Sequence, residues 1–320
     1  MRSLLVLIGS LSSSPVVTDS VSVTTDKGTL RGTSRSVNGV SVSSYLGVPF
    51  AQPPVNDLRF AAPQEESAWS GEWDATFKRP LCSQPANCSG CDVETTAEDC
   101  LYLNVFAPTE LPDEPLPVYY WIHGGSFTGD WHPKWYNGEQ LVGHGGVILV
   151  TVNYRLGALG FLSTGDGVIR GNQGMLDQQL GLDWIRTHIH HFGGDKAKIT
   201  IHGQSAGAIS CKYHAVSPMS GSVDQPKFAN VIVHSGQQMA YNAEPAETAQ
   251  SFARNSGCLT GMLTLSQFSI LQLNRIFNFL GALCQVHPCP THRRNCRRFG
   301  SGARRPVQLV ASGRRRLPLE

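Results

Sequence analysis

One stretch of the chain decides the fold: residues 199–215 read ITIHGQSAGAISCKYHA. Its first three residues predict a short buried strand, and residues 206–215 predict a helix. The turn between them contains Gly203-Gln204-Ser205-Ala206-Gly207, so side chains are absent two positions before and after the serine. Such a strand-to-helix turn strains the serine backbone and lifts its hydroxyl clear of a sheet. It also places the Ala206 amide at the positive end of a helix, where it can stabilise an oxyanion.

A second glycine motif, His123-Gly124-Gly125-Ser126-Phe127, follows an apolar run at residues 118–122. Small residues after a strand allow successive backbone amides to converge on one point, as an acyl-transfer site requires. Taken alone, the motif is also compatible with an ordinary glycine turn. Its combination with the Ser205 turn favours a site that stabilises a tetrahedral anion.

Apolar strands and helical segments alternate through the middle of the chain. Strands are predicted at residues 118–122, 147–152, 199–201 and 231–233, and helices at 174–190 and 206–215. We expect Asn172 to cap the first of these helices and Gly193-Gly194 to end it. This alternation predicts an α/β fold with a mostly parallel central sheet. Short β-like segments between residues 21 and 50, with a hairpin signal at Asn38-Gly39, predict small antiparallel strands at the N-terminus.

With these motifs in place, the sequence resembles the type B carboxylesterase and cholinesterase family of α/β hydrolases. The resemblance covers about residues 22–258. It rests on stretches that occur in the family's order: 45–54 (YLGVPFAQPP), 58–60 (LRF), 98–105 (EDCLYLNV), 123–127 (HGGSF), 152–157 (VNYRLG), 171–178 (GNQGMLDQ), 192–195 (FGGD), 203–207 (GQSAG) and 234–236 (HSG).

The resemblance implies a carboxylic ester hydrolase that acts on small-molecule esters through an acyl-Ser205 intermediate and needs no cofactor. It implies an oxyanion hole formed by the amides of Gly125, Ser126 and Ala206, with Gly124 beside them. Two further sets of residues match structural features of the family. They are the disulfide Cys82–Cys100 and the ion pairs Arg59–Glu98 and Arg155–Asp177. Cys258 is similar to the first cysteine of a second disulfide.

Some positions depart from the family pattern. Ser126 stands where many members have a third glycine, and Gln204 stands where glutamate is common. The loop from Cys82 to Cys100 contains no tryptophan, so it lacks an aromatic platform for choline. This favours a general carboxylesterase over a choline-ester enzyme.

The acid and the histidine base are the largest departure. In this fold they follow the nucleophile in the chain, and the resemblance implies positions beyond residue 320, so we expect a truncated chain. His214 and His234 match family positions that are not the base. A substitute pair, Glu244 or Glu247 with His287 or His292, would satisfy the order but lies outside any family motif. The alternative function is a catalytically inactive, cholinesterase-like adhesion or binding protein of the same fold.

Charge divides the chain into two parts. Residues 1–247 carry a net charge of −8, whereas residues 248–320 carry 11 Arg and one acid, a net +10. We expect an esterase portion at residues 21–258 and a basic tail at 259–320, produced by a truncated or misjoined reading frame. The tail's arginine clusters could instead contact nucleic acid, but no aromatic residues interleave them, so we expect no such partner. Its cysteine and histidine residues have no recognised zinc-ligand spacing, so no metal is expected.

Three smaller signals concern the cellular compartment. Residues 1–20 resemble a weak signal peptide, which predicts a secreted or endoplasmic reticulum protein. Asn87 lies in a glycosylation sequon, and Cys88 and Cys91 form a C-x-x-C pair that predicts a local disulfide or free thiols. No run approaches the length of a transmembrane helix. The sequence leaves the oligomeric state open.

Overall fold

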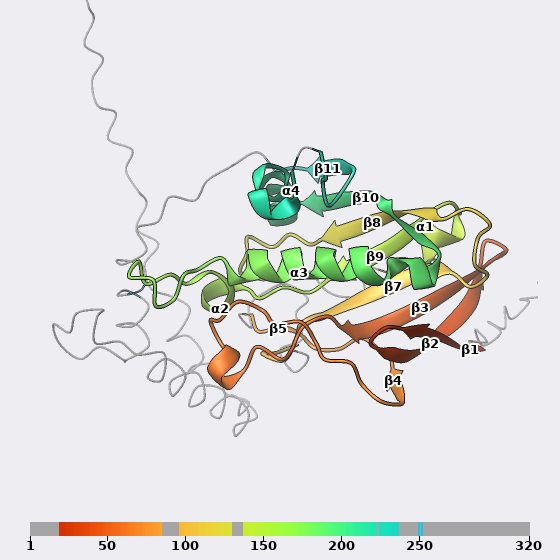
Figure 1. Cartoon of the computed structure of the whole chain (residues 1–320), viewed down its shortest axis with the longest axis horizontal. Coiled ribbons are helices and arrows are strands. Elements are labelled where there is room, and N and C mark those ends of the chain that lie inside the picture. The colour runs from red at the N-terminus through yellow and green to blue at the C-terminus, as the bar shows by residue number, and fades with distance from the viewer. Residues whose placement is uncertain are drawn as a thin grey trace, which may run out of the picture. The chain divides into compact units, whose positions relative to one another are not determined.

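A computed structural model of the chain describes residues 19–84, 96–129, 137–222 and 224–236, together with Ala249 and Ser251. Most described strands join one sheet (Figure 1). Its strands are β1 (Asp19–Thr25), β2 (Gly28–Val37), β3 (Val40–Pro49), β4 (Glu72–Asp74), β7 (Tyr102–Pro108), β8 (Leu116–Ile122), β9 (Ile148–Val152), β10 (Gly194–Gln204) and β11 (Asn230–His234). A separate pair is formed by β5 (Leu81–Cys82) and β6 (Thr96–Ala97).

The sheet is mixed. Its strand order is β1-β2-β3-β7-β9-β8-β10-β11, with β4 paired to β2. Strands β9, β8, β10 and β11 are parallel to one another, and every pairing from β1 through β7 to β9 is antiparallel. The predicted parallel sheet therefore describes only these four strands. The antiparallel part is larger than expected because β7 continues it into the middle of the sheet.

The described helices are α1 (Glu139–Gly143), α2 (Gly157–Phe161), α3 (Gln173–His188) and α4 (Ala206–Val216), with 3₁₀ turns η1 (Asn56–Leu58), η4 (Ile189–Phe192) and η5 (Pro218–Ser220). Helix α1 packs mainly against the antiparallel strands β2, β3 and β7, whereas α3 and α4 pack against the parallel strands. In Figure 1, α3 runs across the sheet and α4 lies beside β10 and β11. None of the helices in the described ranges has the length and apolarity to span a bilayer.

Helix α3 approaches β8 closely. A Cβ added at Gly181 would lie 2.6 Å from the Tyr120 hydroxyl, which donates a hydrogen bond to the Gln178 carbonyl. Leu182 and Ile185, on the same helix, are buried against the sheet. These contacts hold α3 against β8, the strand that leads into the His123 loop.

The start of α3 differs from the expectation. Asn172 occupies the N-cap position with φ 62°, but its side chain forms no capping hydrogen bond. Asparagine is favoured at this position because it tolerates the left-handed backbone conformation better than most residues do. Gly193, with φ 80°, ends η4 directly after α3, close to the predicted end of the helix.

Two neighbouring parallel strands carry the motifs of interest. Ile122 at the end of β8 pairs with Gly203 near the end of β10. Because the carboxyl ends of parallel strands meet at one edge of a sheet, the His123 loop and the Ser205 turn leave the sheet side by side.

Candidate active site

Ser205 lies at a strained turn between β10 and α4. Its backbone has φ 55° and ψ −117°, outside the regions that serine ordinarily adopts. The Ser205 amide donates to the His234 carbonyl at 2.8 Å, and the Ser205 carbonyl accepts from the Ile209 amide at 3.0 Å. These two bonds, one to β11 and one within the first turn of α4, hold the conformation. The residue is half-buried.

The flanking glycines are required by direct backbone contact. A Cβ at Gly203 would lie 2.3 Å from the Gly207 carbonyl oxygen, and one at Gly207 would lie 2.0 Å from the Ile122 carbonyl oxygen. Both distances are far inside van der Waals contact. The spacing of small residues around Ser205 thus follows from α4 starting directly against the end of β8.

The loop after β8 reaches the serine. A Cβ at Gly124 would lie 2.6 Å from the Gln204 carbonyl oxygen and 3.1 Å from the Ser205 Cβ. The next three residues, Gly125, Ser126 and Phe127, all have positive φ, at 110°, 57° and 59°. The loop therefore coils tightly beside Ser205.

Several contacts hold this coil in place. The Gly125 carbonyl accepts from the Thr128 and Gly129 amides, both at 3.0 Å. The Tyr154 hydroxyl donates to the His123 carbonyl at 2.9 Å, and the two rings stack with centroids 4.2 Å apart. Both side chains are buried. Tyr154 lies in the motif at residues 152–157, but the sequence analysis gave it no role. Its position just after β9 is the sequence feature that could have indicated a contact with the neighbouring loop after β8.

The coil leaves backbone donors available. Within the described part of the chain, the amides of Gly125, Ser126 and Ala206 donate to no carbonyl. The Ala206 amide also lies at the N-terminus of α4, the positive end of the helix. Amides gathered next to a serine hydroxyl can stabilise the oxygen of a tetrahedral intermediate.

The first two histidines that follow Ser205 in the chain have other partners. His214 is buried in α4, and its Nε2 lies 2.9 Å from the Gln178 side-chain oxygen. Burial lowers the pKa of His214 to about 4. The His234 ring lies 3.3 Å from His202 Nε2. Among the residues that the structure describes, no side chain hydrogen bonds to the Ser205 hydroxyl.

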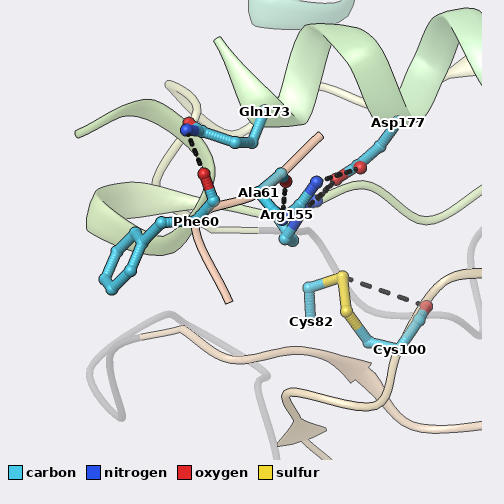
Figure 2. A network of polar contacts seen from close by, with 7 residues as sticks. All are labelled: Phe60, Ala61, Cys82, Cys100, Arg155, Gln173 and Asp177. Atoms are coloured by element: carbon cyan, nitrogen blue, oxygen red, sulfur yellow. Dashed lines mark hydrogen bonds and ion pairs between the residues drawn. A yellow bond between two sulfur atoms is a disulfide. The ribbon is translucent and has the colours of Figure 1, made fainter. Parts of the chain in front are cut away.

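A network of polar contacts joins the segment after β9 to other loops (Figure 2). Arg155 donates to both carboxylate oxygens of Asp177, at 2.8 and 2.7 Å, and to the Ala61 carbonyl at 2.9 Å. Gln173, at the start of α3, donates to the Phe60 carbonyl at 2.7 Å. These bonds tie the segment after β9 and the helix α3 to residues 60–61.

Two further links lie on the same side. Arg59 pairs with Glu98 through two hydrogen bonds, one of 2.8 Å between Nη2 and Oε1. Cys82 and Cys100 form a disulfide with a Cα–Cα distance of 4.9 Å, which confirms the pairing that the family resemblance implied. Cys211 is a free, buried cysteine.

Some predicted residues lie outside the described ranges. They are Asn87, Cys88, Cys91, Glu244, Glu247, Cys258, residues 1–18 of the signal-like segment, and the basic tail with His287 and His292. Residues 19 and 20 of that segment lie in β1.

Sequence comparison agrees with this geometry. A profile described as "Carboxylesterase family" matches residues 19–282. The chain belongs to the carboxylesterase family. The match continues past residue 258, where the recognisable motifs end, and includes every described residue.

Curated carboxylesterase-like proteins are similar over most of the chain. A carboxylic ester hydrolase of Bombus ignitus is 43% identical over 74% of the chain and 43% of its own length. Pyrethroid hydrolase Ces2e of Rattus norvegicus is 36% identical over 85% of the chain and 48% of its own length. Acylcarnitine hydrolase of Mus musculus is 37% identical over 78% of the chain and 48% of its own length. The chain thus matches about half the length of these relatives.

Proposed function

We propose that the protein is a serine carboxylic ester hydrolase in which Ser205 is the nucleophile. The observation that carries the proposal is the contact of Gly124 with Ser205, since a Cβ at Gly124 would lie 3.1 Å from the Ser205 Cβ. It brings together two motifs that are 81 positions apart in the chain. The strained backbone of Ser205 supports the same assignment, because strain of this kind concentrates at functional sites.

The proposed reaction has two acyl-transfer steps. The Ser205 oxygen attacks the ester carbonyl carbon, and the carbonyl π electrons move to oxygen, where the amides of Gly125, Ser126 and Ala206 donate to the anion. Collapse of this intermediate expels the alcohol, which takes up the proton lost by the serine. Water then attacks the acyl-serine in the same way and releases the acid. Each backbone donor contributes about 10²–10³ in kcat.

A serine hydroxyl needs a general base for this attack. The proposal assigns no acid or base to this chain, because His214 and His234, the described histidines that follow Ser205, have other contacts. The same observation favours a second candidate function, a binding protein that keeps the site geometry without turnover.

A fluorophosphonate probe distinguishes the two functions, because it forms a covalent bond only with an activated serine. The full chain is treated with the probe, and the modified peptide is identified by mass spectrometry. For the hydrolase we expect labelling at Ser205 that is lost in Ser205→Ala and retained in Ser217→Ala. Ser217 is a matched control because it lies at the opposite end of α4. Absence of labelling in the folded wild-type chain would exclude the hydrolase and support the binding protein.

The substrate class and compartment are also proposals. The names of the relatives describe hydrolysis of carboxylic esters, pyrethroids and acylcarnitines, and we propose small-molecule esters as the shared class. Acyl transfer through serine requires no cofactor. The Cys82–Cys100 disulfide supports an oxidising compartment, in keeping with a secreted or endoplasmic reticulum protein.

A further inference from the structure

A group of potential metal ligands lies where α3 ends, away from the Ser205 turn. Asp26 is in the turn between β1 and β2, His188 is the last residue of α3, and His191 is in η4. Their ligand atoms all lie within 4.8 Å of one another. The Asp26 carboxylate is 3.7 Å from His188 Nδ1 and 3.6 Å from His191 Nε2.

Among the residues that the structure describes, His188 has no hydrogen-bond partner for either ring nitrogen. Its side chain is 2% exposed, and both nitrogens are buried. Within the same described part of the chain, His191 Nε2 is also buried without a hydrogen-bond partner. The 3.7 Å separation from Asp26 is too long for a hydrogen bond. Buried polar atoms without partners are uncommon, and binding of an ion is one physical explanation for them.

A cation lies beside the cluster. Lys27, next to Asp26 in the chain, pairs with Glu65, with 2.7 Å between Nζ and Oε1.

We propose that Asp26, His188 and His191 form a binding site for a late first-row divalent cation, with Zn²⁺ as the occupant. Two imidazoles and one carboxylate are ligands that suit Zn²⁺, and water can fill the fourth tetrahedral position. The three-residue spacing of the two histidines places both on one side of the helix end.

Metal binding requires the ligand atoms to move closer together. Ligand atoms around tetrahedral zinc are about 3.3–3.5 Å apart at zinc–ligand distances of ~2.0–2.1 Å. The separations from Asp26 exceed this by a few tenths of an ångström, and the three ligand atoms together lie within 4.8 Å of one another. Asp26 is 66% exposed and can move. The bound ion would clamp the β1–β2 turn onto η4.

Zinc binding to the full chain tests the proposal. The metal-free chain is dialysed at pH 7.5 against buffered Zn²⁺, and bound zinc is measured by mass spectrometry. Wild type should bind one more zinc ion per chain than Asp26→Asn or His191→Gln, with affinity at this site lowered more than about 100-fold in either variant. His190→Gln is the matched control, because His190 is an exposed histidine beside His191; it should bind zinc like wild type.

Two independent readouts accompany the stoichiometry. A hundredfold excess of zinc over Kd should raise the Tm of wild type and His190→Gln by about 5–10 °C and leave Asp26→Asn unchanged. Cu²⁺ at the same site should quench Trp184, whose ring centroid is 5.1 Å from that of His188. His188→Gln removes a buried ligand and can destabilise the chain, so the two more exposed ligands decide the result. Equal zinc binding by wild type, Asp26→Asn and His191→Gln, or no binding by wild type, would overturn the proposal.

Discussion

The substitution Asp177→Asn tests how strongly the buried ion pair supports the site. The Asp177 carboxylate accepts from the Arg155 amide, Nε and Nη2, at 2.9, 2.8 and 2.7 Å. The two side chains are 0% and 3% exposed. An amide in this position leaves the guanidinium buried without a counter-charge. Removing one partner of such a pair costs about 3–5 kcal/mol of unfolding free energy.

The assay is urea unfolding of the full chain followed by circular dichroism. With an m-value of about 2–3 kcal/mol/M, the midpoint should fall by about 1–2 M. Asp183→Asn is the matched control in the same helix, because Asp183 forms a half-exposed pair with Lys227. Its loss should cost less than about 1 kcal/mol. Similar midpoint shifts for the two variants would refute the view that the buried pair fixes the loop after β9.

Three further predictions follow from individual contacts. Gly124→Ala, whose Cβ would meet the Gln204 carbonyl and Ser205, should slow fluorophosphonate labelling about 10²–10³-fold with unchanged circular dichroism; labelling at the wild-type rate would contradict the site geometry. Replacing both Cys82 and Cys100 with serine should cost about 3 kcal/mol in urea unfolding, because the 18-residue separation closes a modest loop, and an unchanged midpoint would argue against this. Burial lowers the pKa of His214 from 6.5 to about 4. Between these pH values the unfolded chain therefore binds one more proton than the folded chain, and the free energy of unfolding should rise from about pH 4 to 6.5. His214→Gln should flatten this rise in urea unfolding, and an unchanged slope would count against a buried, neutral His214.

Local spacing in the sequence was sufficient to predict the Ser205 turn. A Cβ at Gly203 would meet the Gly207 backbone within the turn, whereas a Cβ at Gly207 would meet the Ile122 carbonyl at the end of β8. The position of Gly124 beside the oxyanion hole was implied by the family resemblance alone. Proof of its contact with Ser205 required the register of β8 against β10.

The pairing direction of the sheet was less accessible. Strand β7 was not predicted as a strand, because its apolar residues alternate only in part: Leu103 and Val105 are buried, and so are the adjacent Phe106 and Ala107. It pairs antiparallel with both β3 and β9. Because β7 was missing from the predicted strands, the hydrophobic pattern alone could not show where the antiparallel part of the sheet ends and the parallel part begins.

The proposed metal site had no signal in the sequence. Asp26 and His188 are 162 positions apart, and neither belongs to a recognised ligand motif. Only the packing of the β1–β2 turn against the end of α3 brings them together. Among the described residues, His188 lacks hydrogen-bond partners because of how the tertiary structure packs around it. The spacing of residues in the sequence cannot show this.

A crystal structure of the chain phosphonylated by the probe tests the central claim most directly. The account predicts a covalent bond from Ser205 Oγ to phosphorus, with the phosphoryl oxygen about 2.7–3.1 Å from at least two of the amides of Gly125, Ser126 and Ala206. An adduct on another residue, or a phosphoryl oxygen that points to solvent away from these amides, would contradict it.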